Sequence, residues 1–158
     1  MAVYAGSGIQ TVQPGAFVVF DTTIVPCEMG LIQHSDGTPI FSVSGWRNSN
    51  GTSGCCCCNQ NKPTLYSAEL DMNVALSEGA TVAPITVAIA VDGVSLPISE
   101  MDSTPAAAGE YNHVGRKISL PILRNCCQTV AVQNTSAQPI DVKYPIITLT
   151  RPDLGCIA

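Results

Sequence analysis

Residues 65–76, LYSAELDMNVAL, alternate between apolar and polar side chains. The even positions from 66 to 76 carry Tyr, Ala, Leu, Met, Val and Leu, whereas the odd positions from 67 to 73 carry Ser, Glu, Asp and Asn. A period of two places each set of side chains on its own face of a β-strand, and a helix does not keep that period. The segment therefore predicts a strand with one buried face.

Two Asp-Gly pairs indicate β-hairpins. Asp36-Gly37 separates the apolar runs 30–34 and 40–44, and Asp92-Gly93 follows the segment 85–91 directly. Both residue types tolerate the positive φ that tight hairpin turns require. Segment 85–91 is apolar at nearly every position, which predicts a central strand buried on both faces, and residues 94–98 are expected to pair with it.

The rest of the chain also favours strands, and no segment predicts a helix. Residues 134–139 have the composition of a turn, and residues 47–63 and 99–109 that of long loops. Residues 1–11 are expected to form a flexible N-terminal arm. Short strands at regular spacing predict one all-β domain over residues 1–158, an antiparallel sandwich. The remaining expected strands lie in residues 17–20, 110–123, 126–133 and 140–150.

The composition favours self-association and excludes several classes of partner. Charged residues make up 12% of the chain, mean hydropathy is +0.25 and the net charge is −5. A chain with so few charges either buries an unusually large fraction of its residues or hides apolar surface against copies of itself, and we favour the second alternative. The 7 basic residues are scattered, so no nucleic-acid partner is expected. No apolar run is long enough for a membrane span, and the first residues lack the pattern of a signal peptide.

The second half of the chain carries its motifs in a recognisable order. LYSAELDMNVAL is followed by ITVAIAVDGVSLPI, then by KISLPILRNCCQTVAVQNTSAQPI and a closing YPIITLTRPD. In this order residues 64–152 resemble the tumour-necrosis-factor-like and complement-globular-head-like jelly rolls of Firmicute phage structural proteins and spore-surface proteins. The resemblance implies a jelly roll of about 8–10 strands that forms a homotrimer. The chain lacks the collagen-like Gly-X-Y repeat of the spore-surface type.

The 8 cysteines stand outside that resemblance, and their chemistry stays open between three alternatives. Zinc ligands usually come as spaced pairs, a pattern that Cys55 and Cys58 meet but the adjacent Cys126 and Cys127 do not. These four are weak metal candidates, and no cofactor is expected. A disulfide between the two groups, or reduced thiols throughout, are the other two alternatives. The candidate disulfide partners are Cys55, Cys56, Cys57, Cys58, Cys126 and Cys127.

The residue types used in catalysis do not form a known motif. His34 lies beside a hairpin turn and His113 lies in a strand-like stretch, and neither belongs to a nucleophile or zinc-protease signature. Glu69 and Asp71 share one face of the alternating strand. They form either a hard-cation site such as one for Ca²⁺ or a solvated strand face. We therefore expect no catalytic residues and no enzymatic activity.

These observations lead to three alternative functions. The first is a non-enzymatic, trimeric bacteriophage virion component of the capsid-decoration or head-fibre type. It would assemble in the host cytoplasm, and its partners would be its own copies and the major capsid protein or another virion protein. The second is a binding module of a bacterial cell or spore surface that recognises glycan. The third is a small hydrolase or metalloenzyme built on a sandwich.

Overall fold

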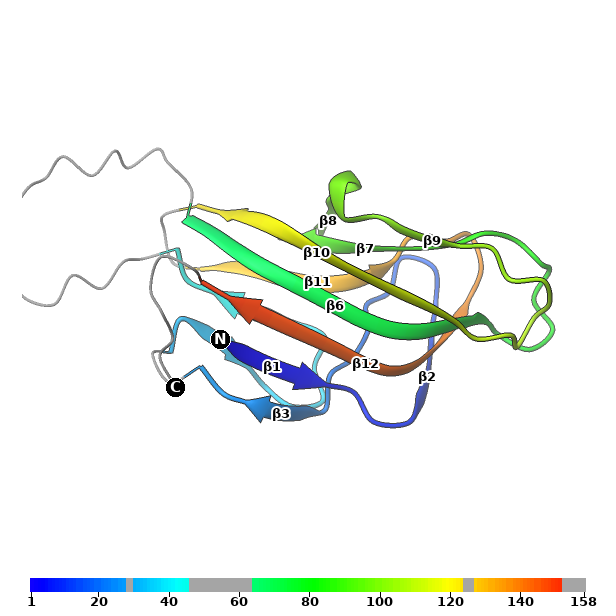
Figure 1. Cartoon of the computed structure of the whole chain (residues 1–158), viewed down its shortest axis with the longest axis horizontal. Coiled ribbons are helices and arrows are strands. Elements are labelled where there is room, and N and C mark those ends of the chain that lie inside the picture. The colour runs from blue at the N-terminus through cyan, green and yellow to red at the C-terminus, as the bar shows by residue number, and fades with distance from the viewer. Residues whose placement is uncertain (28–29, 46–63, 124–126, 152–158) are drawn as a thin grey trace, which may run out of the picture.

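A computed structural model describes residues 1–27, 30–45, 64–123 and 127–151, and it consists of two facing antiparallel sheets (Figure 1). The first sheet has the order β10 (Asn112–Ile122), β6 (Thr64–Leu76), β12 (Ile140–Thr150), β1 (Ala2–Ala5), β3 (Thr22–Val25), and β2 (Ile9–Val12) also pairs with β12. The second has the order β4 (Ile32–His34), β5 (Phe41–Val43), β11 (Gln128–Asn134), β7 (Ile85–Val91), β8 (Val94–Ser95), and β9 (Met101–Ser103) also pairs with β7. The predicted all-β sandwich is confirmed.

The alternating segment forms β6, the longest strand, between β10 and β12. Its even-numbered side chains from Tyr66 to Leu76 are buried, as the period of two predicts. β10 pairs with it along its whole length, with Ile122 opposite Thr64 and Asn112 opposite Val74. This long pairing makes the first sheet a continuous platform whose inner face packs against the second sheet.

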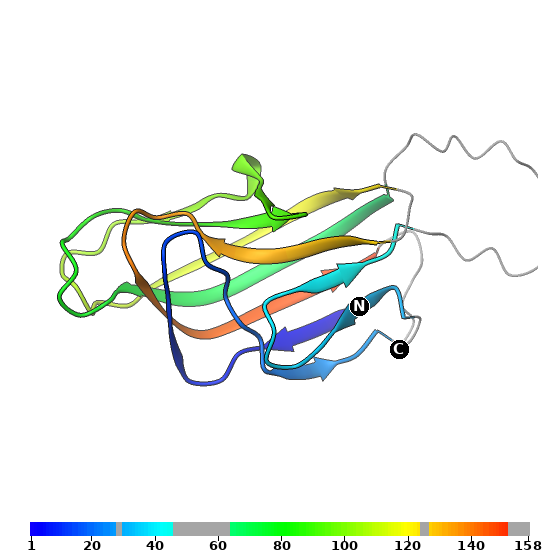
Figure 2. The same cartoon turned by 180° about the vertical axis from the view of Figure 1, so that it is seen from behind.

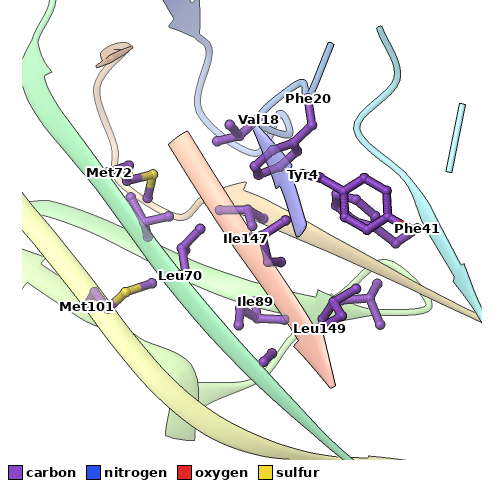
Figure 3. Packing of buried hydrophobic residues seen from close by; sticks show 14 of the residues in the cluster. Tyr4, Val18, Phe20, Phe41, Leu70, Met72, Ile89, Met101, Ile147 and Leu149 are labelled. Carbon is purple, nitrogen blue, oxygen red and sulfur yellow. The ribbon is translucent and has the colours of Figure 1, made fainter. Parts of the chain in front are cut away.

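Buried apolar side chains from both sheets fill the space between them (Figure 3). Leu70, Met72 and Ile147 enter from the first sheet, and Ile89 and Phe41 enter from the second. Burying one side chain of this size stabilises the folded chain by about 1.5–3 kcal/mol, so the two inner faces hold the sandwich together. The outer faces are left to define any interaction surface.

Both predicted hairpins are present. β4 and β5 flank a turn in which Gly37 has φ 81°, and β7 and β8 flank a turn in which Asp92 and Gly93 have φ 50° and 79°. Two consecutive positive φ values are typical of the type I′ turn, whose twist matches that of the paired strands. Figure 2 shows the molecule from behind, with the second sheet toward the viewer.

The N-terminal segment differs from the expected flexible arm. β1 pairs with β12 and β3, and β2 pairs with β12, so residues 2–5 and 9–12 belong to the first sheet. Ala2, Tyr4 and Val12 are buried in the core, which the short length of each strand obscured. Residues 17–20 form isolated bridges at Phe17 and Phe20 rather than the expected strand.

The region after the second hairpin also departs from prediction. The strand expected over 94–98 ends at Ser95, because Pro97 has no backbone N–H to donate and instead opens a 3-10 turn, η1 (Pro97–Ser99). The expected loop 99–109 contains β9, which pairs with β7. β8 and β9 are thus two parts of one edge strand, and the chain between them rises from the sheet edge at the top of Figure 1 before Ser99 of η1 returns to β7. The expected loop 47–63 lies outside the described residues.

Candidate interaction surface

The cysteine prediction falls largely outside the described residues. Cys55 to Cys58 and Cys126 are not described, whereas Cys127 lies just before β11 and is disulfide-bonded. The described residues do not identify its partner, so the pairing expected between the two cysteine groups stays a prediction. Among the described residues, no three His, Cys, Asp or Glu side chains come together as a set of metal ligands.

His34 holds two neighbouring segments together. Its Nδ1 and Nε2 atoms each lie 3.0 Å from a backbone oxygen, of Ile40 and Phe20 respectively. The ring stacks on Phe41 with 4.4 Å between ring centroids, and Tyr4 meets it edge-on at 5.0 Å. These contacts give His34 a structural role, because they pack the β4–β5 hairpin against the chain around residue 20.

The two candidate carboxylates of β6 face basic side chains of β10. Asp71 Oδ1 lies 3.3 Å from His113 Nε2, and Glu69 Oε2 lies 3.3 Å from Lys117 Nζ. Gly115 is opposite Asp71, and a Cβ atom there would lie 2.5 Å from Asp71 Oδ1. Because Gly115 has no side chain, the carboxylate of Asp71 can occupy this space. This charged face is solvated, so each ion pair contributes little stability.

The outer face of the first sheet divides into two unlike halves. The charged half lies over β6 and β10 and holds the two ion pairs. Because partnered residues in adjacent strands point to the same side, the register assigns the other half to β12, β1 and β3. This low-charge half consists of Val3, Ala5, Thr22, Val25, Ile146 and Thr148. It presents apolar side chains to solvent, with Ile146 40% and Val25 36% exposed.

Two exposed tyrosines, one just before β10 and one in β12, form a cluster with a lysine of β12. Lys143 Nζ lies 5.6 Å from the ring centroid of Tyr111 and 5.2 Å from that of Tyr144, within the range of cation–π attraction. Tyr144 is 56% exposed and has φ 50°. Burial, followed by the nearby Asp141 charge, raises the pKa of Tyr111. We call these three residues the tyrosine–lysine cluster.

A bulge in β12 explains the unusual backbone of Tyr144. The pairing of β12 with β6 shifts register between Lys143 and Ile146. Pro145 anchors the bulge, because its carbonyl accepts a 2.8 Å hydrogen bond from Gly6 N. A Cβ atom on Gly6 would lie 2.7 Å from Pro145 Cγ, so only glycine allows this close approach. The bulge turns the ring of Tyr144 outward.

A polar hollow of about 520 Å³ lies where β9 meets β10, along the edge of the sandwich. Glu100 and Asp102 supply carboxylates to it, and Arg116 and His113 supply basic groups. Arg116 Nη1 donates to the backbone oxygen of Glu100 at 2.7 Å rather than to a carboxylate. Within the described part of the chain, the ion pairs are His113–Asp71 and Lys117–Glu69, so neither acid of the hollow has a basic partner.

Sequence reasoning did not find the tyrosine–lysine cluster or the hollow. A signal for the first was present, because Lys143-Tyr144-Pro145 interrupts the alternation of an otherwise regular strand. The hollow had no such signal, since it depends on β9 and β10 lying side by side. Among the described residues, no helix has the length and apolar character needed to cross a membrane.

The two-sheet sandwich superimposes on known structures. The globular domain of zebrafish complement 1qA superimposes with a TM-score of 0.63 at 10% identity, over 96% of this chain and 95% of that one. The fold is a jelly roll of the tumour-necrosis-factor and complement-head type. Eiger TNF from S. frugiperda superimposes with a TM-score of 0.60 at 12% identity, over 95% of this chain and 90% of that one.

No protein-family model and no curated protein sequence matches the chain. At such low sequence identity the structural likeness establishes the jelly-roll fold alone, because one fold supports many functions. The function must therefore be argued from the surface of this chain, whose two described features are the divided outer face and the hollow beside it.

Proposed function

We propose that the protein is a non-enzymatic structural component that assembles as a homotrimer through the outer face of its first sheet. The observation that carries this proposal is the low-charge half over β12, β1 and β3. Ile146 and Val25 expose apolar surface there, and Tyr144 borders it. Contiguous exposed apolar surface is typical of contact sites between proteins. The division of the face also supplies an apolar area for contact and a charged area for orientation.

A ring suits this surface better than a pair of copies related by a twofold axis. The two halves of the outer face are chemically different, so a contact between unlike areas buries the apolar half under another part of the next copy. Such head-to-tail contacts close into rings when the rotation permits. A specific interface needs about 1,200–2,000 Å² of total buried surface, and the chain exposes 8356 Å² in all, so it can supply that area to two neighbours.

We further propose that the trimer is part of a bacteriophage virion, as a capsid decoration or head fibre that contacts the major capsid protein or another virion protein. The resemblance of residues 64–152 to phage structural modules supports this location. Low charge and a jelly-roll scaffold are compatible with it. Proteins of the same gene neighbourhood give an independent check, because genes for virion structural proteins are grouped together in phage genomes.

Two measurements test the proposal. Light scattering coupled to size exclusion should give three times the 16.5 kDa mass of the chain at micromolar concentration, and a monomer at every concentration would overturn the assembly. Antibodies against the protein should label purified phage particles from the host that carries the gene. Labelling confined to the cell or spore surface would instead favour the alternative, a glycan-binding surface module, which a glycan array tests directly.

A further inference from the structure

The tyrosine–lysine cluster contains one strained backbone position, at Tyr144, and its exposed ring contributes little to the stability of the folded chain. A non-glycine residue with positive φ costs about 1–3 kcal/mol and persists when its surroundings enforce it. The bulge enforces it at Tyr144, yet the ring is 56% exposed and so gains little from burial. A strained backbone that presents an exposed aromatic ring indicates a contact made outside the folded chain.

Lys143 is the cation available for such a contact. Four basic residues lie in the described part of the chain: Arg116, Lys117, Lys143 and Arg151. Lys117 is paired with Glu69, Arg116 donates to the Glu100 carbonyl, and Arg151 is 1% exposed beneath the ring of Tyr66. Lys143 lies against two tyrosine rings, and no carboxylate of a described residue forms a salt bridge with it.

The hollow between β9 and β10 holds the carboxylates of Glu100 and Asp102 beside the basic groups of Arg116 and His113. Glu100 and Asp102 are exposed and form no salt bridge within the described part of the chain, where Arg116 donates to a backbone oxygen and His113 pairs with Asp71. Met101 and Val114 form an apolar part of its lining, which suits the methylene chain of a lysine and the edge of an aromatic ring. One copy therefore carries both halves of a contact, which are Lys143 beside the β12 bulge and the two carboxylates of the hollow.

We propose that in the assembled trimer Lys143 of each copy enters the hollow of the next copy and pairs with Glu100 and Asp102. This inference rests on the proposed trimer and names the contact that fixes its register. The β9–β10 edge of one copy then covers the low-charge half of its neighbour, with the rings of Tyr111 and Tyr144 at the border. Partial desolvation strengthens the charge pair relative to one on an open surface.

Charge exchange tests the contact. Lys143→Glu places three negative groups together, and Asp102→Lys places positive groups together, so each should raise the concentration at half assembly by about tenfold or more. The double variant Lys143→Glu with Asp102→Lys restores opposite charges and should assemble within about threefold of the original protein. Glu78 is exposed in the turn after β6, so Glu78→Lys makes the same charge change as Asp102→Lys away from the contact and should leave assembly unaltered.

Sedimentation velocity over a range of concentrations measures assembly, and circular dichroism confirms that each variant is folded. The contact is overturned if both single variants assemble as the original protein does, or if the double variant is no better than the worse single variant. If the original protein is a monomer throughout, the proposed trimer itself fails, which is a distinct result. Higher salt should weaken the original trimer more than it weakens any residual assembly of the Lys143→Glu variant.

Discussion

Asp92 shows how one residue can shape a turn and secure a neighbouring strand. Its φ of 50° forms the first position of the β7–β8 turn, a conformation that Asp adopts more readily than most residues. Its carboxylate accepts hydrogen bonds from Gln128 Nε2 at 2.6 Å and from Thr129 N at 2.8 Å, at the start of β11. The hydrogen bond from Gln128, and then that from Thr129, lowers the pKa of Asp92. The turn and β11 are thereby joined.

Substitution of Asp92 by Asn should reduce stability in a pH-dependent way. The folded state stabilises the ionised Asp92 side chain, whereas the unfolded chain does not. The contribution of Asp92 to the unfolding free energy is therefore present above a pH of about 4, and it is lost as the pH falls through the lowered pKa. Because the site is exposed to solvent, we expect a loss of about 1 kcal/mol at pH 7. Urea denaturation at a series of pH values measures it.

The same titration separates the charge effect from a change of shape. The difference in unfolding free energy between Asp92→Asn and the original protein should narrow as the pH falls below about 4. Glu78→Gln removes an exposed carboxylate from the turn after β6 and serves as the control for general charge effects. A difference that stays constant across this pH range would contradict the role assigned to the carboxylate.

At the scale of the element, the edge strand of the second sheet is interrupted between β8 and β9, and one side chain supplies the hydrogen bonds that are missing there. β8 and β9 pair with the two ends of β7, and the chain between them leaves the sheet as η1. Ile89, opposite this gap, donates its amide N–H to Ser99 Oγ at 2.7 Å, and the hydroxyl donates to Leu96 O at 2.7 Å. Ser99 is fully buried and replaces the missing strand.

Ser99→Ala should therefore destabilise the protein by about 2 kcal/mol, because the buried amide of Ile89 loses its partner. Chemical denaturation monitored by circular dichroism gives the value. Ser119→Ala, on the exposed face of β10, makes the same chemical change and should cost less than about 0.5 kcal/mol. Equal stability of the two variants would show that another group satisfies the Ile89 amide.

We expect Tyr144 at the β12 bulge to lower the unfolding free energy of the monomer and to strengthen assembly. Tyr144→Asn places a residue that tolerates positive φ at the strained position, so the unfolding free energy of the monomer should rise by about 1 kcal/mol. The comparison is made in the Lys143→Glu background, in which we expect the monomer, because assembly would otherwise add to the apparent stability. Tyr144→Phe keeps the strain and should leave that free energy nearly unchanged.

In the otherwise unaltered protein, Tyr144→Asn should weaken assembly while Tyr144→Phe should not, because the ring rather than its hydroxyl borders the proposed contact. Sedimentation velocity distinguishes these outcomes. A Tyr144→Asn protein that is less stable as a monomer would mean that the bulge, and not the residue, bears the strain.

At the scale of the whole molecule, the sequence predicted those parts of the fold that local patterns determine. The period of two identified β6, and the Asp-Gly pairs identified both hairpins, because these signals act within a few residues. The sequence did not predict the strands β1, β2 and β9, because each has only 3 or 4 residues and its pairing partner is distant in the sequence. The candidate interaction surface was not predicted for a related reason, since the hollow and the divided face arise from strands that the topology brings together.

The cysteines give the last whole-molecule prediction. Cys127 is disulfide-bonded within one chain, so unreduced, denatured protein should run at the 16.5 kDa mass of a single chain rather than at multiples of it. Reduction should increase the intact mass by two hydrogen atoms for each disulfide. Cys127→Ser should lower the unfolding free energy by about 2–4 kcal/mol under oxidising conditions, because the unfolded chain loses a constraint.

Peptide mapping without reduction then identifies the partner of Cys127, with Cys55 to Cys58 as the predicted group. Measuring the original protein and Cys127→Ser under reducing conditions is the matched control, and the two unfolding free energies should then be nearly equal. If unreduced protein instead runs as a covalent multiple that reduction converts to single chains, the disulfide joins copies. Charge exchange at Lys143 would then separate chains only after reduction, so both experiments should be performed with and without reductant.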